Sequence, residues 1–270
     1  MNDVLLFWVA FWAYLLGMIL NVVATINRRS GLWVSARAVM TIGFAAHTVA
    51  LVWRSIATGH LPLTNLFEYM SLFGWATVLL YVVVGVRLKW ASLGALVAGV
   101  AFAIIVGASL LPKEADTQLV PALQSYWLQI HVTLAVFGEA AFAVAFATSI
   151  AYLVIHSRDS KRGGSLSSSE HLSRLDTLTY NFIKLGYPLF TLGALFAGAV
   201  WAQRAWGSFW SWDPKEVGSL IVWLVYTAYL HTRYVRNWRG TGSAVLSVTG
   251  FALAIFTLLG SLFLPGLHAY

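Results

Sequence analysis

The stretch WLQIHVTLAVFGEAAFAVAFATSIAYLVI, residues 127–155, decides the fold class of this chain. It contains one acidic residue, Glu139, and neither lysine nor arginine. About 20 apolar residues are enough for a helix to cross the hydrocarbon core of a bilayer. Because lipid satisfies no backbone polar group, an apolar run of this length must be helical inside the membrane. The stretch therefore predicts a transmembrane helix.

Similar apolar runs fill most of the remaining sequence. About eight occur in all, near residues 3–25, 36–56, 68–87, 91–111, 127–155, 180–201, 216–235 and 244–264. Only 10% of the 270 residues are charged, against about 25% in a soluble domain. We therefore predict an all-α polytopic integral membrane protein with about eight transmembrane helices and a single membrane domain over residues 1–270. The first run lacks a basic leader and a small-residue cleavage site, so it is interpreted as a retained anchor.

The positive charge is distributed in a way that predicts topology. A net charge of +7 would suit nucleic acid, but most Lys and Arg residues fall at alternate ends of the predicted helices: Arg28, Arg29, Arg37, Arg87, Lys89, Arg158, Lys161, Arg162, Arg174, Arg233, Arg236 and Arg239. The positive-inside rule makes this set cytoplasmic. Both chain termini and the connection between the sixth and seventh helices are then predicted to be extracytoplasmic, and no nucleic-acid partner is expected.

Two compositional features limit the chemistry. The Gly/Ser-containing connection over residues 156–178 predicts a flexible cytoplasmic loop. The chain has no cysteine, which excludes disulfides and a thiolate nucleophile of its own. Any thiol chemistry must therefore be supplied by a partner.

The connection between the sixth and seventh helices, WAQRAWGSFWSWDPKEVGSL at residues 201–220, is rich in tryptophan. A spacing of four places Trp206 and Trp210 on one face of a short helix lying in the interface, where they would form a shelf for a flat apolar group. A general aromatic belt is the alternative. Asp213 and Pro214 predict the cap and first turn of the next helix, with Glu216 completing a capping box.

Two histidines flank this connection at the same predicted depth. His131 lies near the outer end of the fifth helix, and His268 follows the last one. Two imidazoles beside an aromatic shelf suit haem, whose iron accepts axial histidine ligands. The alternative is a pair of interfacial histidines that reach toward water. Considered together with the tryptophans, the ligand interpretation is favoured.

Three further residues lie deeper. His231 falls about 22 Å below the outer end of its helix, too far to share an iron with His131. His47 lies near the middle of the second helix, so the two histidines predict either a second haem position or helix–helix hydrogen bonds. Glu139 would either tune a ligand or hold two helices together.

The string WGSFWSWDPKEVGSL resembles the tryptophan-rich WWD signature of haem-handling proteins, and specifically that of the CcsA (ResC) family of cytochrome c-type biogenesis proteins. Members of the related CcmC and CcmF families share a WWD string. The resemblance extends to HTVALVWRSIATGHLPLTNLFEYM (residues 47–70), the helix bearing His131, the YLHTR motif around His231, and the terminal His268.

This resemblance implies a subunit of the system II holocytochrome c synthase (a haem lyase). Such a subunit exports haem b (iron protoporphyrin IX) and presents it to apocytochrome c for covalent attachment at a C-x-x-C-H motif. The implied partners are a CcsB/ResB-like membrane subunit, the apocytochrome and thiol-reducing proteins. The implied location is the plasma or inner membrane, or the thylakoid membrane, with haem at the extracytoplasmic face.

The resemblance also implies residue roles. His131 and His268 ligate the outer haem iron, and His231 ligates an inner one together with either His47 or the partner subunit. The platform residues are Trp206, Trp210, Trp212 and Asp213. No side chain makes or breaks bonds, so catalysis amounts to positioning haem. Arg204 and Lys215 either pair with haem propionates or only reach the headgroups.

Two other functions are compatible with the composition. One is a dihaem electron-transfer membrane protein with a quinone-type site in the aromatic connection. The other is a transporter of a different amphipathic solute that uses histidines as proton relays. The tryptophan string favours the haem-delivery interpretation over both.

Overall fold

The computed structural model describes residues 2–27, 29–85, 91–115, 117–160, 166–260, 263–264 and 266–267. The secondary structure of these residues is helical and includes no strand, which confirms the all-α prediction. The chain divides into two compact units, residues 1–124 and 125–270. The single membrane domain stays a prediction.

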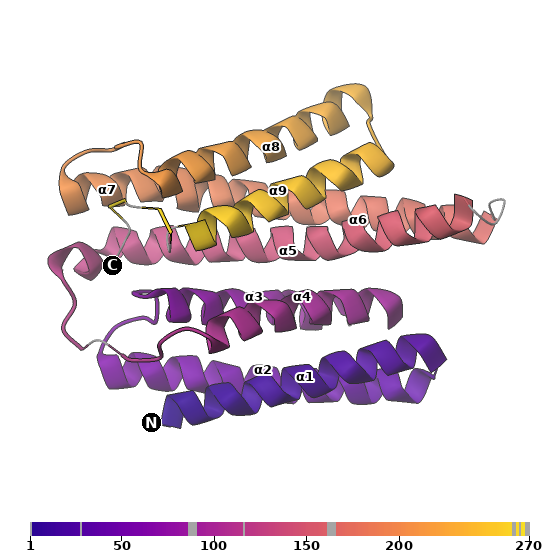
Figure 1. The fold of residues 1–270 in the computed structure, drawn as a ribbon, viewed down its shortest axis with the longest axis horizontal. Helices are drawn as coiled ribbons and strands as arrows, with labels where there is room; N and C mark the ends of the chain where they lie inside the picture. Colours follow the sequence, from indigo (N-terminus) through magenta and orange to yellow (C-terminus); the bar gives the residue numbers. More distant parts are fainter. Residues whose placement is uncertain are drawn as a thin grey trace. The chain divides into compact units, whose positions relative to one another are not determined.

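Unit 1 consists of four helices and a short 3-10 turn. They are α1 (Asn2–Asn27), α2 (Ser30–Thr58), α3 (Leu66–Gly85), α4 (Ala91–Ser109) and η1 (Pro121–Gln124). Helix α1 packs along α2 and α4, and α3 packs along α4 (Figure 1). Large side chains such as Tyr14, Met40 and Phe73 are fully buried between them. Many apolar residues of α1 and α2 remain exposed, as expected for surfaces that face lipid.

Unit 2 is built around one long helix. Its elements are α5 (Tyr126–Ser160), α6 (Leu166–Phe190), the π-helix η2 (Thr191–Ala197), α7 (Gly198–Trp206), α8 (Pro214–Arg236) and α9 (Thr241–Gly260). Helix α5 packs against α6, η2 and α9, and its middle is buried on nearly every face. A helix that is apolar all round belongs in a protein interior, so α5 forms the centre of unit 2.

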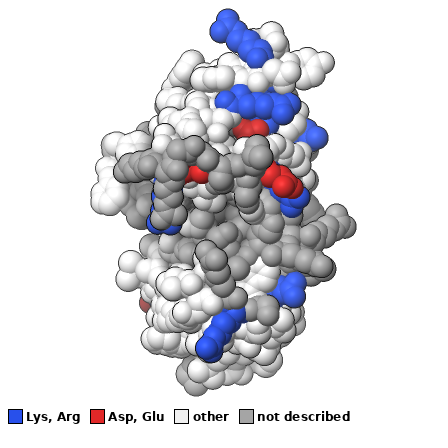
Figure 2. Space-filling view, turned by 90° about the vertical axis from the view of Figure 1, so that its right-hand side faces the viewer, with Lys and Arg blue, Asp and Glu red and all other residues white. Residues whose placement is uncertain are grey.

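The helices of unit 2 end in two groups at opposite ends of the unit (Figure 1), and the residues at these two ends differ in chemistry. The tryptophan end gathers the start of α5, the end of α7, the start of α8 and the end of α9. The basic end carries the α5–α6 and α8–α9 connections. Lys and Arg side chains are visible on the face drawn in Figure 2. The exposed cations in and beside these two connections include Arg158, Arg174, Arg236 and Arg239. The segregation of charge expected from the sequence is therefore present within unit 2.

Each of the eight apolar runs corresponds to helix in the described part of the chain. Among the described residues, six helical stretches are long and apolar enough to cross a membrane: Asn2–Asn27, Gly31–Thr58, Leu66–Val83, Tyr126–Ser160, Ser169–Trp206 and Thr241–Gly260. The apolar part of α4, Leu93–Ser109, is shorter. Helix α8 has 23 residues but is more polar, with two basic residues in its last turn. The chain is therefore a multi-pass membrane protein, while the count of eight spans and the orientation of the termini stay predictions.

The flexible loop predicted over residues 156–178 is wrong for most of its length. Helix α5 continues to Ser160 and α6 begins at Leu166, while residues 161–165 lie outside the described part of the chain. Leu175 is buried, and the next residue, Asp176, forms two hydrogen bonds with Arg233 of α8, at 2.9 and 2.5 Å. Through these contacts one face of α6 packs against the rest of unit 2, although the composition of this helix is polar.

Candidate functional site

The site at the tryptophan end begins with His131, in the second turn of α5. The imidazole Nδ1 lies 2.9 Å from the backbone carbonyl oxygen of Gly193 in η2. Its ring is parallel to the Trp201 indole within 7°, with ring centroids 5.7 Å apart. A backbone group and an aromatic face from two different elements therefore set the orientation of this imidazole.

The Gly193 carbonyl reaches His131 because the helix is locally widened. In η2 this oxygen accepts the N–H of Gly198, five residues later, instead of a donor four residues later. Pro188, just upstream in α6, has no N–H, and membrane helices re-satisfy such interruptions by local π adjustments. A Cβ on Gly193 would lie 2.5 Å from the backbone nitrogen of Ala135, so only glycine permits this approach of η2 to α5.

The hydrogen bond to Gly193 also fixes the tautomer of His131. A carbonyl oxygen only accepts, so Nδ1 carries the proton and donates it. Nε2 is then the acceptor nitrogen of the ring. Metal-ligating histidines usually donate their second ring N–H to a carbonyl or carboxylate, which fixes the ring and raises its basicity. His131 has this arrangement.

An aromatic column continues from His131 toward the end of α7. Trp201 is buried and meets Trp206 edge to face, with centroids 4.7 Å apart. Trp206 is the last residue of α7, which ends at Gly207 in the left-handed conformation, φ 82°. Trp201 was given no role from the sequence, although it is the first residue of the tryptophan-rich connection quoted there.

The predicted interfacial helix carrying Trp206 and Trp210 is wrong. Gly207 ends α7, and no helix forms from there to the start of α8. Trp210 instead meets Trp212 edge to face in the loop, with centroids 5.8 Å apart. Trp212 is 72% exposed and has φ 61°, a region that a bulky side chain rarely adopts. Such strain is tolerated where the surroundings enforce it, and it is common at binding sites.

The predicted cap of α8 is confirmed. Asp213 Oδ1 accepts the N–H of Lys215 at 2.9 Å, and Pro214 occupies the first helical position. Glu216 Oε2 closes the capping box by accepting the N–H of Asp213 at 3.2 Å. The same oxygen accepts the N–H of Ser211 at 2.7 Å, so Glu216 also holds the loop before the helix.

The C-terminal segment is tied to this cap. The backbone N–H of Leu267 donates to Asp213 Oδ2 at 2.6 Å, and a Cβ on Gly266 would lie 2.5 Å from the same oxygen. His268 itself lies outside the described residues. Its chain neighbour nevertheless contacts the helix cap that follows Trp212.

The two deeper histidines are in different surroundings. His231 is exposed on α8 near the basic end of unit 2, far along the helix from Asp213. His47 is fully buried in unit 1, where Nδ1 lies 3.3 Å from the Tyr14 hydroxyl and Nε2 lies 2.8 Å from the Ser71 hydroxyl. Both ring nitrogens of His47 thus have side-chain partners, which is the helix–helix contact given above as the alternative to ligation.

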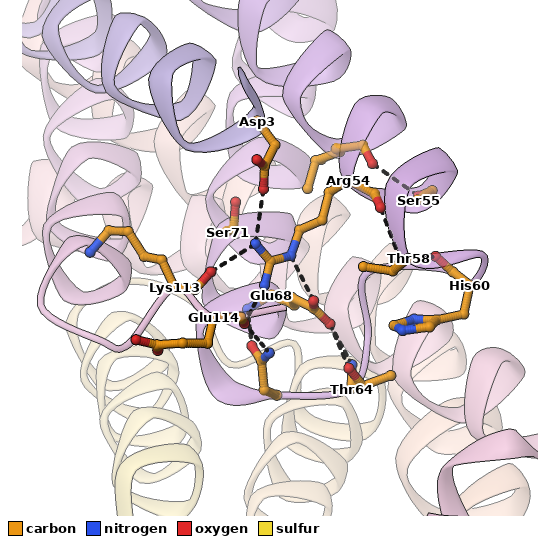
Figure 3. Close-up of polar contacts among 12 residues, drawn as sticks. Asp3, Arg54, Ser55, Thr58, His60, Thr64, Glu68, Ser71, Lys113 and Glu114 are labelled. Atoms are coloured by element: carbon orange, nitrogen blue, oxygen red, sulfur yellow. Dashed lines mark hydrogen bonds and ion pairs between the residues drawn. The ribbon is translucent and has the colours of Figure 1, made fainter. Parts of the chain in front are cut away.

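Unit 1 also contains a buried ion network that the sequence reasoning missed (Figure 3). The Arg54 side chain is 3% exposed and donates to Glu68 at 2.7 Å and to Asp3 at 3.0 Å. It also donates to the backbone carbonyls of Lys113 and Glu114, at 3.0 and 2.7 Å. The signal was available, since ionisable residues inside apolar segments usually have a charged partner. The network ties the start of α1 to α2, α3 and the segment after α4.

The chain is similar in sequence to proteins of cytochrome c assembly. The model of the Cytochrome C assembly protein family matches residues 63–268. A cytochrome c biogenesis protein CcsA of Chlamydomonas reinhardtii is 38% identical over 241 residues, covering 87% of this chain and 67% of that protein. A protein of the same name from Guillardia theta is 35% identical over 244 residues, covering 83% of this chain and 81% of that protein.

A solved structure shares the fold. Cytochrome c Heme Lyase CcmF superposes with a TM-score of 0.71 at 20% sequence identity, over 96% of this chain. The chain spans 48% of the length of that protein. At this identity the likeness concerns the arrangement of the helices alone.

Proposed function

The chain belongs to the cytochrome c assembly protein family, and from that premise we propose that it presents haem b at the tryptophan end of unit 2 to apocytochrome c. Membership places the chain in cytochrome c biogenesis and implies that it handles haem. Haem is the substrate here, and covalent attachment to the apocytochrome consumes it. We also propose that the chain exports this haem from the cytoplasmic side of the membrane.

One observation carries the proposal: the hydrogen bond from His131 Nδ1 to the Gly193 carbonyl. It directs the acceptor nitrogen, Nε2, to the role of axial ligand, and the parallel Trp201 ring limits rotation of the imidazole. Asp213 binds the backbone next to His268, which supports His268 as the second axial ligand. These two contacts support the proposal of a haem ligated by His131 and His268.

The tryptophans supply the surface for the porphyrin face. Trp206, Trp210 and Trp212 are half-buried or exposed at the tryptophan end. Stacked and edge-on indoles bury large areas of a flat apolar partner, and the strained backbone at Trp212 keeps that ring outward. Arg204 at the end of α7 and Lys215 at the start of α8 are proposed to pair with the haem propionates.

The proposed chemistry of the chain is orientation. Each cysteine sulfur of the apocytochrome forms a bond to one carbon of a haem vinyl group, and the thiol proton passes to the other carbon. The histidine of the C-x-x-C-H motif replaces one of the two axial imidazoles of this chain. Holding both faces of the haem until that exchange fixes the vinyl groups in reach of the thiols. The thiols are kept reduced by partner proteins, since this chain has no cysteine.

The proposal extends to the orientation of the chain in the membrane and to the roles of His231 and His47. The basic end of unit 2 is proposed as cytoplasmic and the tryptophan end as extracytoplasmic, in an eight-span protein of the plasma, inner or thylakoid membrane. His231 is exposed, so an inner haem would take its other ligand from a CcsB/ResB-like subunit. His47 is assigned to packing, because its two nitrogens already bind hydroxyls.

Cytochrome c maturation in cells that depend on this chain tests the proposal. His131→Ala and His268→Ala are each expected to reduce covalent haem staining of c-type cytochromes to background, and added imidazole to restore part of it. His47→Asn is the matched control, and it should retain maturation per amount of folded protein. Normal maturation by His131→Ala would contradict the proposal, and loss in His47→Asn at normal protein levels would return His47 to the ligand set.

A further inference from the structure

The interior of unit 2 contains three hydroxyl groups in unusual surroundings. The side chains of Tyr226 and Tyr229 on α8 and Ser247 on α9 are 0–1% exposed. Their hydroxyl oxygens have no hydrogen-bond partner among the described residues. In unit 1 the equally buried Tyr14 hydroxyl binds His47, which shows that the fold does satisfy such groups elsewhere.

The three hydroxyl-bearing side chains lie on α8 and α9, two helices that pack against each other. Tyr226 lies against Gly250 of α9, where an added Cβ would be 2.8 Å from the phenol Cζ. Helices α8 and α9 run antiparallel across a short turn, so one turn further along α8 corresponds to one turn earlier on α9. Tyr229 and Ser247 each lie three residues, about one helical turn, from this contact on their own helices.

A carboxyl group lies on the helix that Tyr226 contacts. Tyr226 stacks on Phe142 of α5 with ring centroids 3.7 Å apart, and Glu139 precedes Phe142 by one helical turn. Glu139 therefore lies on the same face of α5 as Phe142, the residue that Tyr226 contacts.

Three unsatisfied hydroxyls carry a large cost. A buried polar group without a partner loses the hydrogen bonds that it made to water, and lipid supplies none. Proteins meet this requirement with internal water, which typically makes two to four hydrogen bonds to buried polar groups. A site lined by several hydroxyls offers hydrogen-bond partners to a water molecule, whereas an apolar cavity offers none.

We propose that Tyr226, Tyr229 and Ser247 bind internal water in the core of unit 2, next to Glu139. This hydration site lies deeper than the haem platform and does not depend on haem. Water at this depth lowers the cost of a charge on Glu139, since ions are far less costly beside water than in a dry interior. The site thus accounts for a carboxyl group in the middle of the most buried helix.

Hydroxyl-radical footprinting of the full chain in nanodiscs tests the site, because radicals generated by X-rays from bound water oxidise the side chains that hold it. Tyr226 and Tyr229 are expected to be oxidised at least tenfold faster than Tyr14, which is equally buried but paired with His47. Equal, slow oxidation of all three tyrosines would overturn the proposal.

Substitution by phenylalanine gives a second measurement with a matched control. If Tyr226 binds water, Tyr226→Phe removes a satisfied hydroxyl and should lower Tm by about 2–4 °C, as Tyr14→Phe should in unit 1. If the core is dry, Tyr226→Phe removes a destabilising group and raises Tm while Tyr14→Phe still lowers it. That second pattern would contradict the hydration site and would leave the haem proposal untouched.

Discussion

His47 and His131 both lie on apolar helices, but their surroundings differ in kind. In unit 1, His47 is sealed between Tyr14 and Ser71 and has side-chain partners at both nitrogens. In unit 2, His131 is half-buried, is oriented by a backbone carbonyl and rests on Trp201. The first arrangement joins three helices through side chains, and the second fixes the ring through a backbone carbonyl and an indole.

A similar contrast separates other polar and aromatic residues of the two units. Near the loops of unit 1, Arg54 and Glu68 are buried and paired with each other. At the tryptophan end of unit 2, Trp212 is exposed and its backbone is strained. Paired and buried polar groups indicate stability, whereas exposed aromatic rings held in strained positions indicate binding.

The largest expected effect concerns stability in unit 1. Arg54→Ala leaves the carboxylate of Glu68 buried without its partner and should cost about 3–5 kcal/mol of unfolding free energy. Arg174→Ala is the control, because its ion pair with Glu170 is exposed and should change stability by less than about 1 kcal/mol. Thermal unfolding in detergent measures both, and equal effects would mean that the Arg54 network is not a stabilising element.

A smaller effect is expected where η2 meets α5. Gly193→Ala places a methyl group against Ala135 and should cost about 1–3 kcal/mol while displacing the acceptor of His131. Gly99→Ala is the control, since a Cβ there meets nothing within 4 Å. The optical spectrum of bound haem should lose bis-histidine character only in Gly193→Ala. An unchanged spectrum would show that the Gly193 carbonyl does not position the ligand.

The smallest expected change in stability concerns the strained backbone at Trp212. Trp212→Gly relieves the positive φ and should raise unfolding free energy by about 1 kcal/mol, because the ring is mostly exposed. Haem retention should fall at the same time. Asn237→Gly, at the other positive φ of a non-glycine residue in the described chain, should change neither by much. Retained haem in Trp212→Gly would remove this ring from the platform.

Much of the architecture was predictable from the sequence because bilayer thickness limits the choices. The apolar runs gave the helices, and Asp213, Pro214 and Glu216 gave the start of α8, since capping is a local interaction. The loop predicted over residues 156–178 was wrong because Leu175 and Asp176 are stabilised by tertiary contacts with distant residues.

The details of the site depended on long-range geometry. The interfacial helix predicted to carry Trp206 and Trp210 does not form, because Gly207 adopts a left-handed conformation that ends α7. The spacing of the tryptophans does not reveal this conformation. Residues 191–197 themselves do not predict a π-helix, and Pro188 upstream indicates only that the helix is interrupted, not where the widened turn forms. The partner of His131 was therefore beyond sequence reasoning, although His131 itself was not.

The central claim is that haem iron is held by His131 and His268 at the tryptophan end of unit 2. A cryo-EM structure of the haem-loaded chain with its membrane partner tests it most directly. The account predicts porphyrin density against Trp206, Trp210 and Trp212, with His131 Nε2 and a His268 ring nitrogen bonded to iron. Haem bound elsewhere, or an iron out of reach of His131, would contradict the account.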